Sequence, residues 1–283
     1  MQIRSALQQA TQALASSSDS ARLDAELLLC KVLAKHRSYL FTWPEQELNS
    51  EHYAEFHSLV NQRLQGTPVA YLLGYREFWG MELEVSAATL IPRPDTELIV
   101  QLALERLESY SAPKLLDLGT GTGAIALALA KERPDAEIIA LDKSAEALAV
   151  AERNQLKLRL NNVRLMHSDW LSALDQASRF DLIISNPPYI AESDPHLEQG
   201  DLRFEPRLAL SAGVDGLKDL SYLIQTAPPY LKDLGWLLLE HGYDQSLVVT
   251  QLLKNTGYTE IGCYQDLGGN DRVSLGRFPH TIV

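Results

Sequence analysis

The fold of this chain is decided by the stretch Lys114-Leu-Leu-Asp-Leu-Gly-Thr-Gly-Thr-Gly-Ala124. It reads as a short apolar strand, a glycine-rich loop and the start of a helix, in the order found where an open α/β sheet binds a ligand. Glycine adopts backbone conformations that other residues avoid and lets a ligand approach the main chain closely. The stretch therefore predicts a ligand site at the carboxyl end of this strand.

Strands and helices alternate along the rest of the C-terminal part. Such alternation predicts an α/β fold, with a mostly parallel sheet covered by helices on both faces. The last connection, residues 266–271, has hairpin length, so at least one terminal strand should be antiparallel. The expected strands are 114–118, 137–141, 163–167, 181–185, 235–240, 258–264 and 271–277, and the expected helices are 123–131, 144–158, 217–231 and 244–255.

The N-terminal part has a different pattern. Residues 1–75 carry apolar side chains at helical spacing and predict a small helical bundle. Residues 76–92 alternate between apolar and polar after Gly80 and predict a linker with a β-hairpin. We therefore expect a helical domain at 1–75, a linker at 76–92 and the α/β domain at 93–283.

The charge of the 283-residue chain is acidic and uneven, with a formal net charge of −12. Residues 1–80 hold seven Lys/Arg against eight Asp/Glu, whereas residues 81–283 hold 18 against 29. An acidic α/β part argues against a broad electrostatic grip on nucleic acid.

Cysteine and histidine usage argues against a disulfide scaffold and a metal site. Cys30 and Cys263 lie far apart in the sequence, which favours a reducing compartment. The seven histidines show no HxxxH or HxH spacing, so we expect no metal. The N-terminus lacks a charged-then-apolar signal, and no apolar run reaches about 18 residues. We expect a cytoplasmic protein that does not associate with membranes.

The glycine loop alone fits two classes of cofactor. Gly119, Gly121 and Ala124 satisfy the dinucleotide pattern G-x-G-x-x-G/A, which is typical of NAD sites. Asp117 favours S-adenosylmethionine instead, because a carboxylate just before the glycines suits an ammonium or sulfonium and would repel a pyrophosphate. Gly123 also occupies a position that the dinucleotide pattern leaves free.

Acidic residues follow the next two predicted strands. Asp142 can accept hydrogen bonds from both ribose hydroxyls, and the alternative is that it caps the helix expected from Ser144. Asp169 and Trp170 suit an adenine, because the carboxylate can accept from its amino group and the indole can lie beside its ring.

Asn186-Pro187-Pro188-Tyr189 follows the fourth predicted strand. The two prolines fix φ and remove two N–H donors, so the stretch is a rigid bend. The Asn186 side-chain oxygen and the Pro187 carbonyl are candidate acceptors for a flat NH2-bearing group, against which Tyr189 can pack its ring. The alternative is a plain strand-ending turn, since Asn-Pro is common in turns.

These motifs together resemble a class I, Rossmann-like methyltransferase. In such enzymes Asn-Pro-Pro-Tyr accompanies methylation of planar, conjugated NH2 nitrogens, such as adenine N6 in nucleic acid or the glutamine amide in protein. Ile91-Pro-Arg-Pro-Asp-Thr-Glu97, with a helical domain before it, is similar to the peptide-chain release factor glutamine methyltransferase (PrmC/HemK) family. The resemblance covers nearly the whole chain, although Asp95 stands where many relatives would have Glu.

The resemblance implies methyl transfer from S-adenosylmethionine to the side-chain amide nitrogen (N5) of the Gly-Gly-Gln glutamine in release factors, which tunes translation termination. It implies a seven-stranded sheet and a helical domain that recognises the protein substrate, and we expect a monomer that binds no nucleic acid directly. The implied cofactor-binding residues are Asp117, Gly119, Thr120, Gly121, Thr122, Gly123, Asp142, Asp169, Trp170 and Asn186. The implied substrate-binding residues are Asn186, Pro187, Pro188 and Tyr189, of which Asn186, Pro187 and Tyr189 are the implied catalytic residues.

Other functions remain open at the level of sequence. The first is an adenine-N6 methyltransferase acting on DNA or RNA, which the acidic charge and the N-terminal part disfavour. The others are a cofactor-binding adaptor without activity and an NAD-dependent dehydrogenase. Residues 191–215 read either as a flap over the substrate or as a solvated loop. No residue stands out as a general base.

Overall fold

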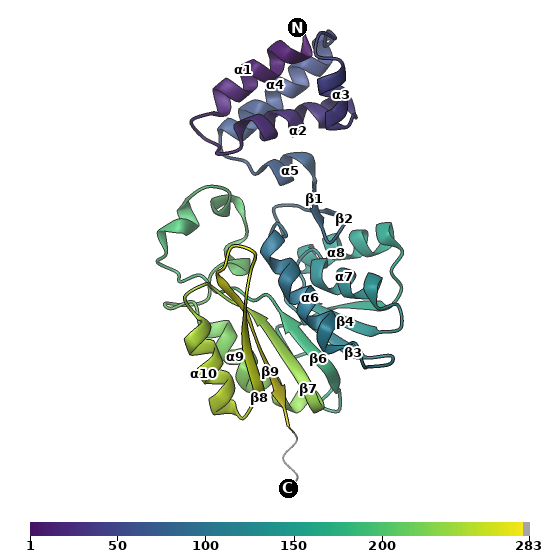
Figure 1. Ribbon diagram of the computed structural model, residues 1–283, viewed down its shortest axis with the longest axis vertical. Coiled ribbons are helices and arrows are strands. Elements are labelled where there is room, and N and C mark those ends of the chain that lie inside the picture. The colour runs from purple at the N-terminus through teal and green to yellow at the C-terminus, as the bar shows by residue number, and fades with distance from the viewer. Residues whose placement is uncertain (280–283) are drawn as a thin grey trace. The chain divides into compact units, whose positions relative to one another are not determined.

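The computed structural model describes residues 1–279 and divides into two compact units (Figure 1). The first unit contains Met1–Tyr75 together with the separate segment Gln199–Phe204. The second contains Arg76–Glu198 and the chain from Glu205 onward. A short segment that follows the Asn-Pro-Pro-Tyr stretch therefore belongs with the N-terminal helices.

The first unit is helical and has its own core. Apolar residues at every third or fourth position of its first helix, among them Ile3, Ala6 and Leu14, pack into that core. Two of its helices were not predicted, because six and five residues are too short to show a period. The helices are α1 (Ile3–Leu14), α2 (Ala21–Leu33), α3 (Arg37–Thr42), α4 (Ser50–Leu64) and α5 (Val69–Leu73).

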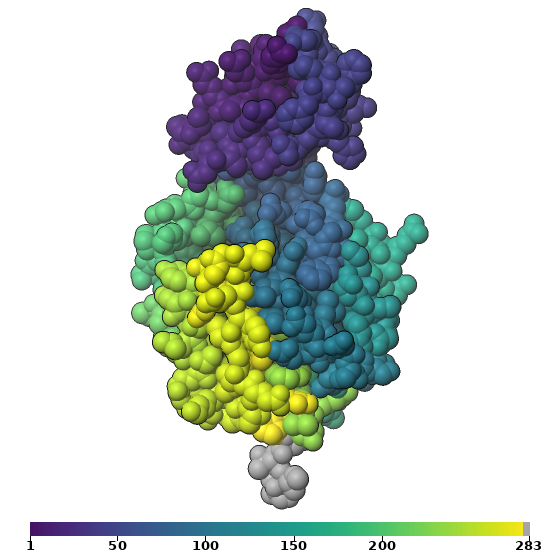
Figure 2. Space-filling view, in the orientation of Figure 1, coloured from purple at the N-terminus to yellow at the C-terminus, as the bar shows by residue number. Residues whose placement is uncertain are grey.

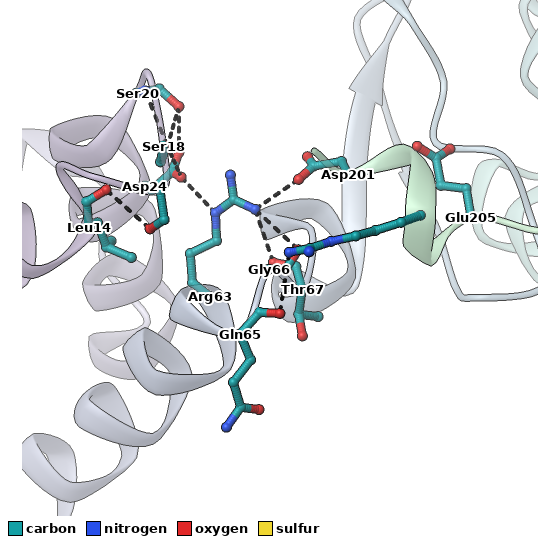
Figure 3. A network of polar contacts seen from close by, with 12 residues as sticks. Leu14, Ser18, Ser20, Asp24, Arg63, Gln65, Gly66, Thr67, Asp201 and Glu205 are labelled. Carbon is teal, nitrogen blue, oxygen red and sulfur yellow. Dashed lines mark hydrogen bonds and ion pairs between the residues drawn. The ribbon is translucent and has the colours of Figure 1, made fainter. Parts of the chain in front are cut away.

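Arg63 in α4 joins the segment Gln199–Phe204 to these helices (Figure 3). Its Nε donates to Asp24 Oδ2 at 2.9 Å, and its Nη1 donates to Asp201 Oδ1 at 2.8 Å. Two serine hydroxyls from the turn before α2 also donate to Asp24, each at 2.7 Å. The side chains of Arg63 and Asp24 are only 11% and 6% exposed, so water and salt screen this ion pair weakly.

The second unit contains a seven-stranded sheet within the described residues, in the order β5-β4-β3-β6-β7-β9-β8. The first five strands in this order, β5, β4, β3, β6 and β7, pair in parallel. Strand β9 is antiparallel to both of its neighbours, β7 and β8. This order confirms the predicted α/β, Rossmann-like class and its antiparallel terminal hairpin. The strands are β3 (Lys114–Leu118), β4 (Glu137–Asp142), β5 (Val163–His167), β6 (Phe180–Ser185), β7 (Leu231–Glu240), β8 (Thr259–Gln265) and β9 (Asp271–Phe278).

Helices cover both faces of the sheet (Figure 1). Successive strand side chains point to opposite faces, so that Leu115 packs in the core beneath α6 and α7 while Leu116 packs beneath α9 and α10. In Figures 1 and 2 α6 lies beside the C-terminal strands, and Arg106 of α6 donates to the Tyr264 hydroxyl of β8. The helices are α6 (Glu97–Arg106), α7 (Ala124–Glu132), α8 (Ala145–Leu158), α9 (Lys218–Thr226) and α10 (Ser246–Thr256).

Short elements complete the chain. The strands β1 (Tyr75–Phe78) and β2 (Met81–Glu84) form a hairpin, whose turn places Trp79 and Gly80 at positive φ. The remaining elements are 3-10 turns: η1 (Pro94–Thr96), η2 (Pro195–Glu198), η3 (Leu202–Phe204), η4 (Arg207–Ala209) and η5 (Pro228–Tyr230). No helix in the part that the structure describes is long and apolar enough to cross a membrane.

The prediction of a helix at 217–231 is wrong in its second half. α9 ends at Thr226, η5 follows, and β7 begins at Leu231 instead of 235. Pro228 and Pro229 lack the N–H donors that would continue the α-helix, which explains the early end.

Candidate active site

Four parallel strands bring the predicted site residues to one edge of the sheet. The glycine loop follows β3, Asp142 ends β4, Asp169 comes after β5 and Asn186 comes directly after β6. Because β3 lies between β4 and β6, the order of connections reverses at this point. Ligands of open α/β sheets bind at such a switch point, beyond the carboxyl ends of the strands.

The glycine loop needs its glycines for two different reasons. Gly119, Gly121 and Gly123 have φ values of +74°, +56° and +84°, in the left-handed region. A Cβ on Gly123 would lie 2.9 Å from Leu127, so packing requires this glycine. A Cβ on Gly121 would meet no atom of the described chain within 4 Å, which leaves this part of the backbone open to a ligand.

Asp117 lies beneath the loop and is only 1% exposed, and one of its two carboxylate oxygens lacks a hydrogen bond within the described chain. The Thr120 hydroxyl donates to its Oδ2 at 2.6 Å, whereas its Oδ1 has no hydrogen-bond partner among residues 1–279. Burial raises the pKa of Asp117 to about 7, the Asp142 carboxylate adds to the rise, and the hydrogen bond from Thr120 opposes it. A buried carboxylate with an unpaired oxygen fits a cationic ligand group, which would remove the cost of burial.

Asp142 connects the loop to the start of α8. Its Oδ2 accepts from the Gly121 N–H at 2.8 Å, and its Oδ1 accepts from the Ser144 N–H at 2.8 Å. The N-cap of α8 is Ser144, whose hydroxyl accepts from the Ala147 N–H, so the alternative role of Asp142 as that cap is wrong. Its contact with a ribose remains a prediction.

Asp169 and Trp170 border the loop from the β5 side. The Trp170 ring lies 3.6 Å from the position that a Cβ of Gly119 would take. Asp169 pairs with Lys143 at 2.8 Å, and its side chain is 56% exposed. Solvent screens such an exposed pair strongly, so Asp169 can exchange Lys143 for a ligand with little loss of stability. Lys143 was not predicted, although its place directly after Asp142 was a signal.

Asn186 and Tyr189 are held by neighbouring elements. Asn186 Nδ2 donates to Thr96 Oγ1 of η1 at 3.2 Å. The Tyr189 hydroxyl donates to Oε1 of Glu240, the last residue of β7, at 3.3 Å. The backbone carbonyl of Tyr189 accepts from Gln245 Nε2 at 3.0 Å. Burial, followed by the nearby Glu240 carboxylate, raises the pKa of Tyr189, so this phenol stays protonated. Side chains of η1, of β7 and of the residue before α10 thus contact the bend that the two prolines predict.

Sequence reasoning missed Thr96 and Glu240. The signal for Glu240 was an acid at the end of the apolar run Trp236–Leu239, and that for Thr96 was its place in the Ile91–Glu97 motif. Neither signal says which side chain the residue meets, because the contacts depend on β7 lying beside β6.

The segment before η1, residues 91–93, and the loop after Tyr189 both form defined contacts. Arg93 forms an ion pair with the buried Glu205, which also accepts from the Ile91 N–H at 2.9 Å. At the base of the loop, Ile190 bridges to Ser211, and the Glu192 N–H donates to the Gly213 carbonyl at 2.9 Å. The ends of the predicted 191–215 segment therefore have defined partners.

No group of three or more His, Cys, Asp or Glu side chains in the described chain could hold a metal ion. The residues gathered at this edge are instead carboxylates, an amide, hydroxyls and a glycine loop whose backbone a ligand can approach at Gly121. That set suits an organic ligand that carries a positive charge and hydroxyl groups. A second molecule that reacts with this ligand could lie at Asn186.

Comparison with known proteins gives the same picture over both units. A family model described as the PrmC N-terminal domain matches residues 5–74, and one described as the methyltransferase small domain matches residues 96–200. The crystal structure of a methyltransferase from Pyrococcus furiosus covers 77% of this chain and 97% of its own, with a TM-score of 0.53 and 18% identity, which is a likeness of fold.

Curated relatives match nearly the full length. The release factor glutamine methyltransferase of Pseudomonas aeruginosa is 53% identical over 92% of this chain and 94% of its own. That of Shewanella oneidensis is 50% identical over 99% of this chain and 97% of its own. With this identity and coverage, the chain belongs to the release factor glutamine methyltransferase family.

Proposed function

We propose that this chain is an S-adenosylmethionine-dependent protein-(glutamine-N5) methyltransferase that modifies the Gly-Gly-Gln glutamine of peptide-chain release factors and so tunes translation termination. The observation that carries the proposal is the near full-length identity to release factor glutamine methyltransferases. The half-satisfied Asp117 and the anchored Asn186 support it from the structure.

The residues at the carboxyl edge of the sheet fit S-adenosylmethionine and its product S-adenosylhomocysteine. When bound, the cofactor supplies a methyl group on a sulfonium. The glycine loop and Asp117 hold its cationic methionine part, because Asp117 lacks a partner for one oxygen. Asp142 accepts from the ribose hydroxyls, and Asp169 with Trp170 borders the adenine.

The acceptor nitrogen needs help, because an amide lone pair is delocalised into its carbonyl. Asn186 Oδ1 and the Pro187 carbonyl accept from the two N–H groups of the substrate amide and stabilise positive charge as it develops on nitrogen. Tyr189 limits rotation of the amide, and Pro188 keeps the bend rigid. Orientation of this kind supplies up to roughly 7–11 kcal/mol. The nitrogen gains the methyl group and loses one proton.

We assign recognition of the release factor to the helical unit. It has a core of its own, and Phe41 and Trp43 are exposed on its surface. Aromatic side chains are enriched in protein interfaces, so this surface suits a protein partner.

Transfer of labelled methyl groups tests the proposal. The purified protein should label a release factor, but not the same release factor with Glu in place of the Gly-Gly-Gln glutamine, and not an adenine-containing DNA or RNA. Labelling of the nucleic acid instead would favour the adenine-N6 alternative.

A further inference from the structure

A buried carboxyl group lies against the Asn-Pro-Pro-Tyr stretch and has no part in the reaction as described so far. Glu240 ends β7, the neighbour of β6, and is 1% exposed. Its Oε1 accepts from the Tyr189 hydroxyl, while its Oε2 has no hydrogen-bond partner within the described chain. An incompletely satisfied buried acid costs stability, so its presence here needs a reason.

Thr96 connects this carboxyl group to Asn186. The Thr96 hydroxyl accepts from Asn186 Nδ2 at 3.2 Å. Thr96 also acts on Glu240, because its side chain lowers the pKa of the Glu240 carboxyl group as a hydrogen-bond donor. A hydroxyl has one hydrogen and two lone pairs, and an ionised carboxylate can only accept. With its hydrogen directed to Glu240, Thr96 is left as an acceptor for Asn186.

We infer that Glu240 is a positioning residue for the methyl-accepting amide, an inference that rests on the proposed function. Its carboxylate takes the Thr96 hydrogen, Thr96 then takes an N–H of Asn186, and Asn186 is held with Oδ1 toward the substrate. The opposite rotamer of the Asn186 amide would present N–H groups, which cannot accept from the substrate N–H. The same carboxylate also accepts from the Tyr189 hydroxyl.

Charged groups on neighbouring elements act on Glu240 in opposite directions. Burial raises the pKa of Glu240 to about 7; hydrogen bonds from Thr96 and Tyr189 and the charge of Arg272 on β9 lower it, and Asp95 on η1 raises it. Above this pH the group is an acceptor only, as the positioning role requires. Below it the carboxyl group carries a hydrogen of its own and competes for the Thr96 lone pairs, so kcat should fall.

Glu240→Gln tests the inference, because it keeps the side-chain volume and removes the carboxylate. With a release factor as substrate and saturating cofactor, kcat should fall by about tenfold to a hundredfold, the cost of a misoriented acceptor. KM for the release factor and the affinity for cofactor should stay nearly unchanged. The decrease of kcat below about pH 7, expected for the wild type, should be absent. Saturating cofactor matters, because Asp117 titrates in the same range and acts on cofactor binding.

Two further variants separate positioning from structure. Glu240→Asp keeps the charge. Unlike Glu240→Gln, it should show the pH dependence of the wild type, and its kcat should lie between those of Glu240→Gln and the wild type. Asp181→Asn is the matched control, since it removes a buried carboxylate at the amino end of β6, where the backbone N–H of Lys114 and the ammonium of Lys232 both donate to it. This control should lower the melting temperature and leave the pH profile of kcat as in the wild type.

Thr96→Val breaks the same connection independently. If Glu240 acts through Thr96, Thr96→Val alone should also remove the pH dependence, and the double variant should lose about as much kcat as the worse single variant. Additive losses, or a folded Glu240→Gln protein with wild-type kcat and pH profile, would overturn the inference. If Glu240→Gln does not fold, retention of the pH dependence by Thr96→Val overturns it. A wild type that leaves release factors unmethylated contradicts the proposed function instead.

Discussion

Two buried acids, Asp117 and Glu240, stand on either side of the site, one beneath the cofactor loop and one behind the acceptor stretch. Each has an oxygen without a hydrogen-bond partner in residues 1–279, and burial raises the pKa of each to about 7. Folded pKa values above those of the unfolded chain mean that the folded protein binds these protons more tightly. The stabilisation is full at low pH and is lost as the pH rises through about 7.

Asp117→Asn should therefore change stability and binding in opposite directions. The unliganded variant should melt at a higher temperature than the wild type at pH 8 and near the same temperature at about pH 3, below the usual pKa of Asp, because it has no charge to bury. Its affinity for cofactor should fall by roughly tenfold to a hundredfold, the equivalent of about 1.5–3 kcal/mol for a charged hydrogen bond. Calorimetric titration and thermal melts measure both effects, and unchanged affinity would count against the role of Asp117.

Wild-type cofactor affinity should also depend on pH through Asp117. A cationic ligand favours the ionised carboxylate, so binding should weaken as the pH falls below about 7. Asp117→Asn should remove this dependence, and its persistence in the variant would assign it to another group.

Asn186→Ala should remove catalysis while cofactor still binds. Losing one oriented acceptor at the site of developing charge costs about a hundredfold to a thousandfold in kcat. Asn255→Ala, on the exposed face of α10, is the control and should keep wild-type kcat. Methylation by Asn186→Ala at a rate close to the wild type would sink the assigned role.

The residues of the site differ in how far sequence could predict them. Asn186 and Asp142 lie in or near short motifs at strand ends, so their position follows from the strand pattern. Thr96 and Glu240 meet across elements that are far apart in the chain, so only the strand order brings them together. The unpaired oxygens of Asp117 and Glu240 could not be predicted, because they depend on complete burial.

At the scale of elements, the glycine loop can be tested against another glycine that also has a positive φ. Gly121 and Gly74 both have positive φ, and a Cβ on either would meet no described atom within 4 Å. Alanine at either position should cost about 1–2 kcal/mol through backbone strain alone. Only Gly121→Ala should also weaken cofactor binding, by about tenfold or more, or about 1.4 kcal/mol. Equal cofactor affinity of the two variants would contradict the assigned role of the loop.

Arg63 allows a similar test of the helical unit. Arg63→Met leaves Asp24 buried without its ionic partner and should lower the free energy of unfolding by about 3 kcal/mol, as for a broken buried pair. Hydrogen exchange in Gln199–Phe204 should rise, because Asp201 loses its contact. Arg4→Met is the control: its pair with Glu45 is exposed and should contribute at most about 1 kcal/mol. Equal effects of the two variants would contradict the role of Arg63.

The elements themselves show which predictions depend on local sequence. The alternation of strands and helices predicted the parallel sheet, because each strand and the helix after it show their own apolar spacing in the local sequence. The early start of β7 was missed because Leu231 and Leu234 are three residues apart, a spacing that also suits a helix, and charged residues lie between them. The place of Gln199–Phe204 with the helices was missed because it depends on the distant Arg63.

At the scale of the whole molecule, the net charge of −12 favours the glutamine of a protein over the adenine of a nucleic acid. A protein that binds nucleic acid contacts its phosphates through Lys and Arg side chains and releases the counterions condensed on them, which requires a cationic surface. Binding to duplex DNA at low salt should therefore be weak, and a gel-shift titration measures it. Tight binding that weakens steeply with salt would contradict this expectation.

Mass spectrometry of a release factor after incubation with the protein and S-adenosylmethionine tests the central claim most directly. Peptide fragmentation should locate one added methyl group on the side chain of the Gly-Gly-Gln glutamine, and the Asn186→Ala protein should leave that peptide almost unmodified. A methyl group on any other residue, or an unmodified release factor beside a methylated adenine in an added nucleic acid, would contradict the account.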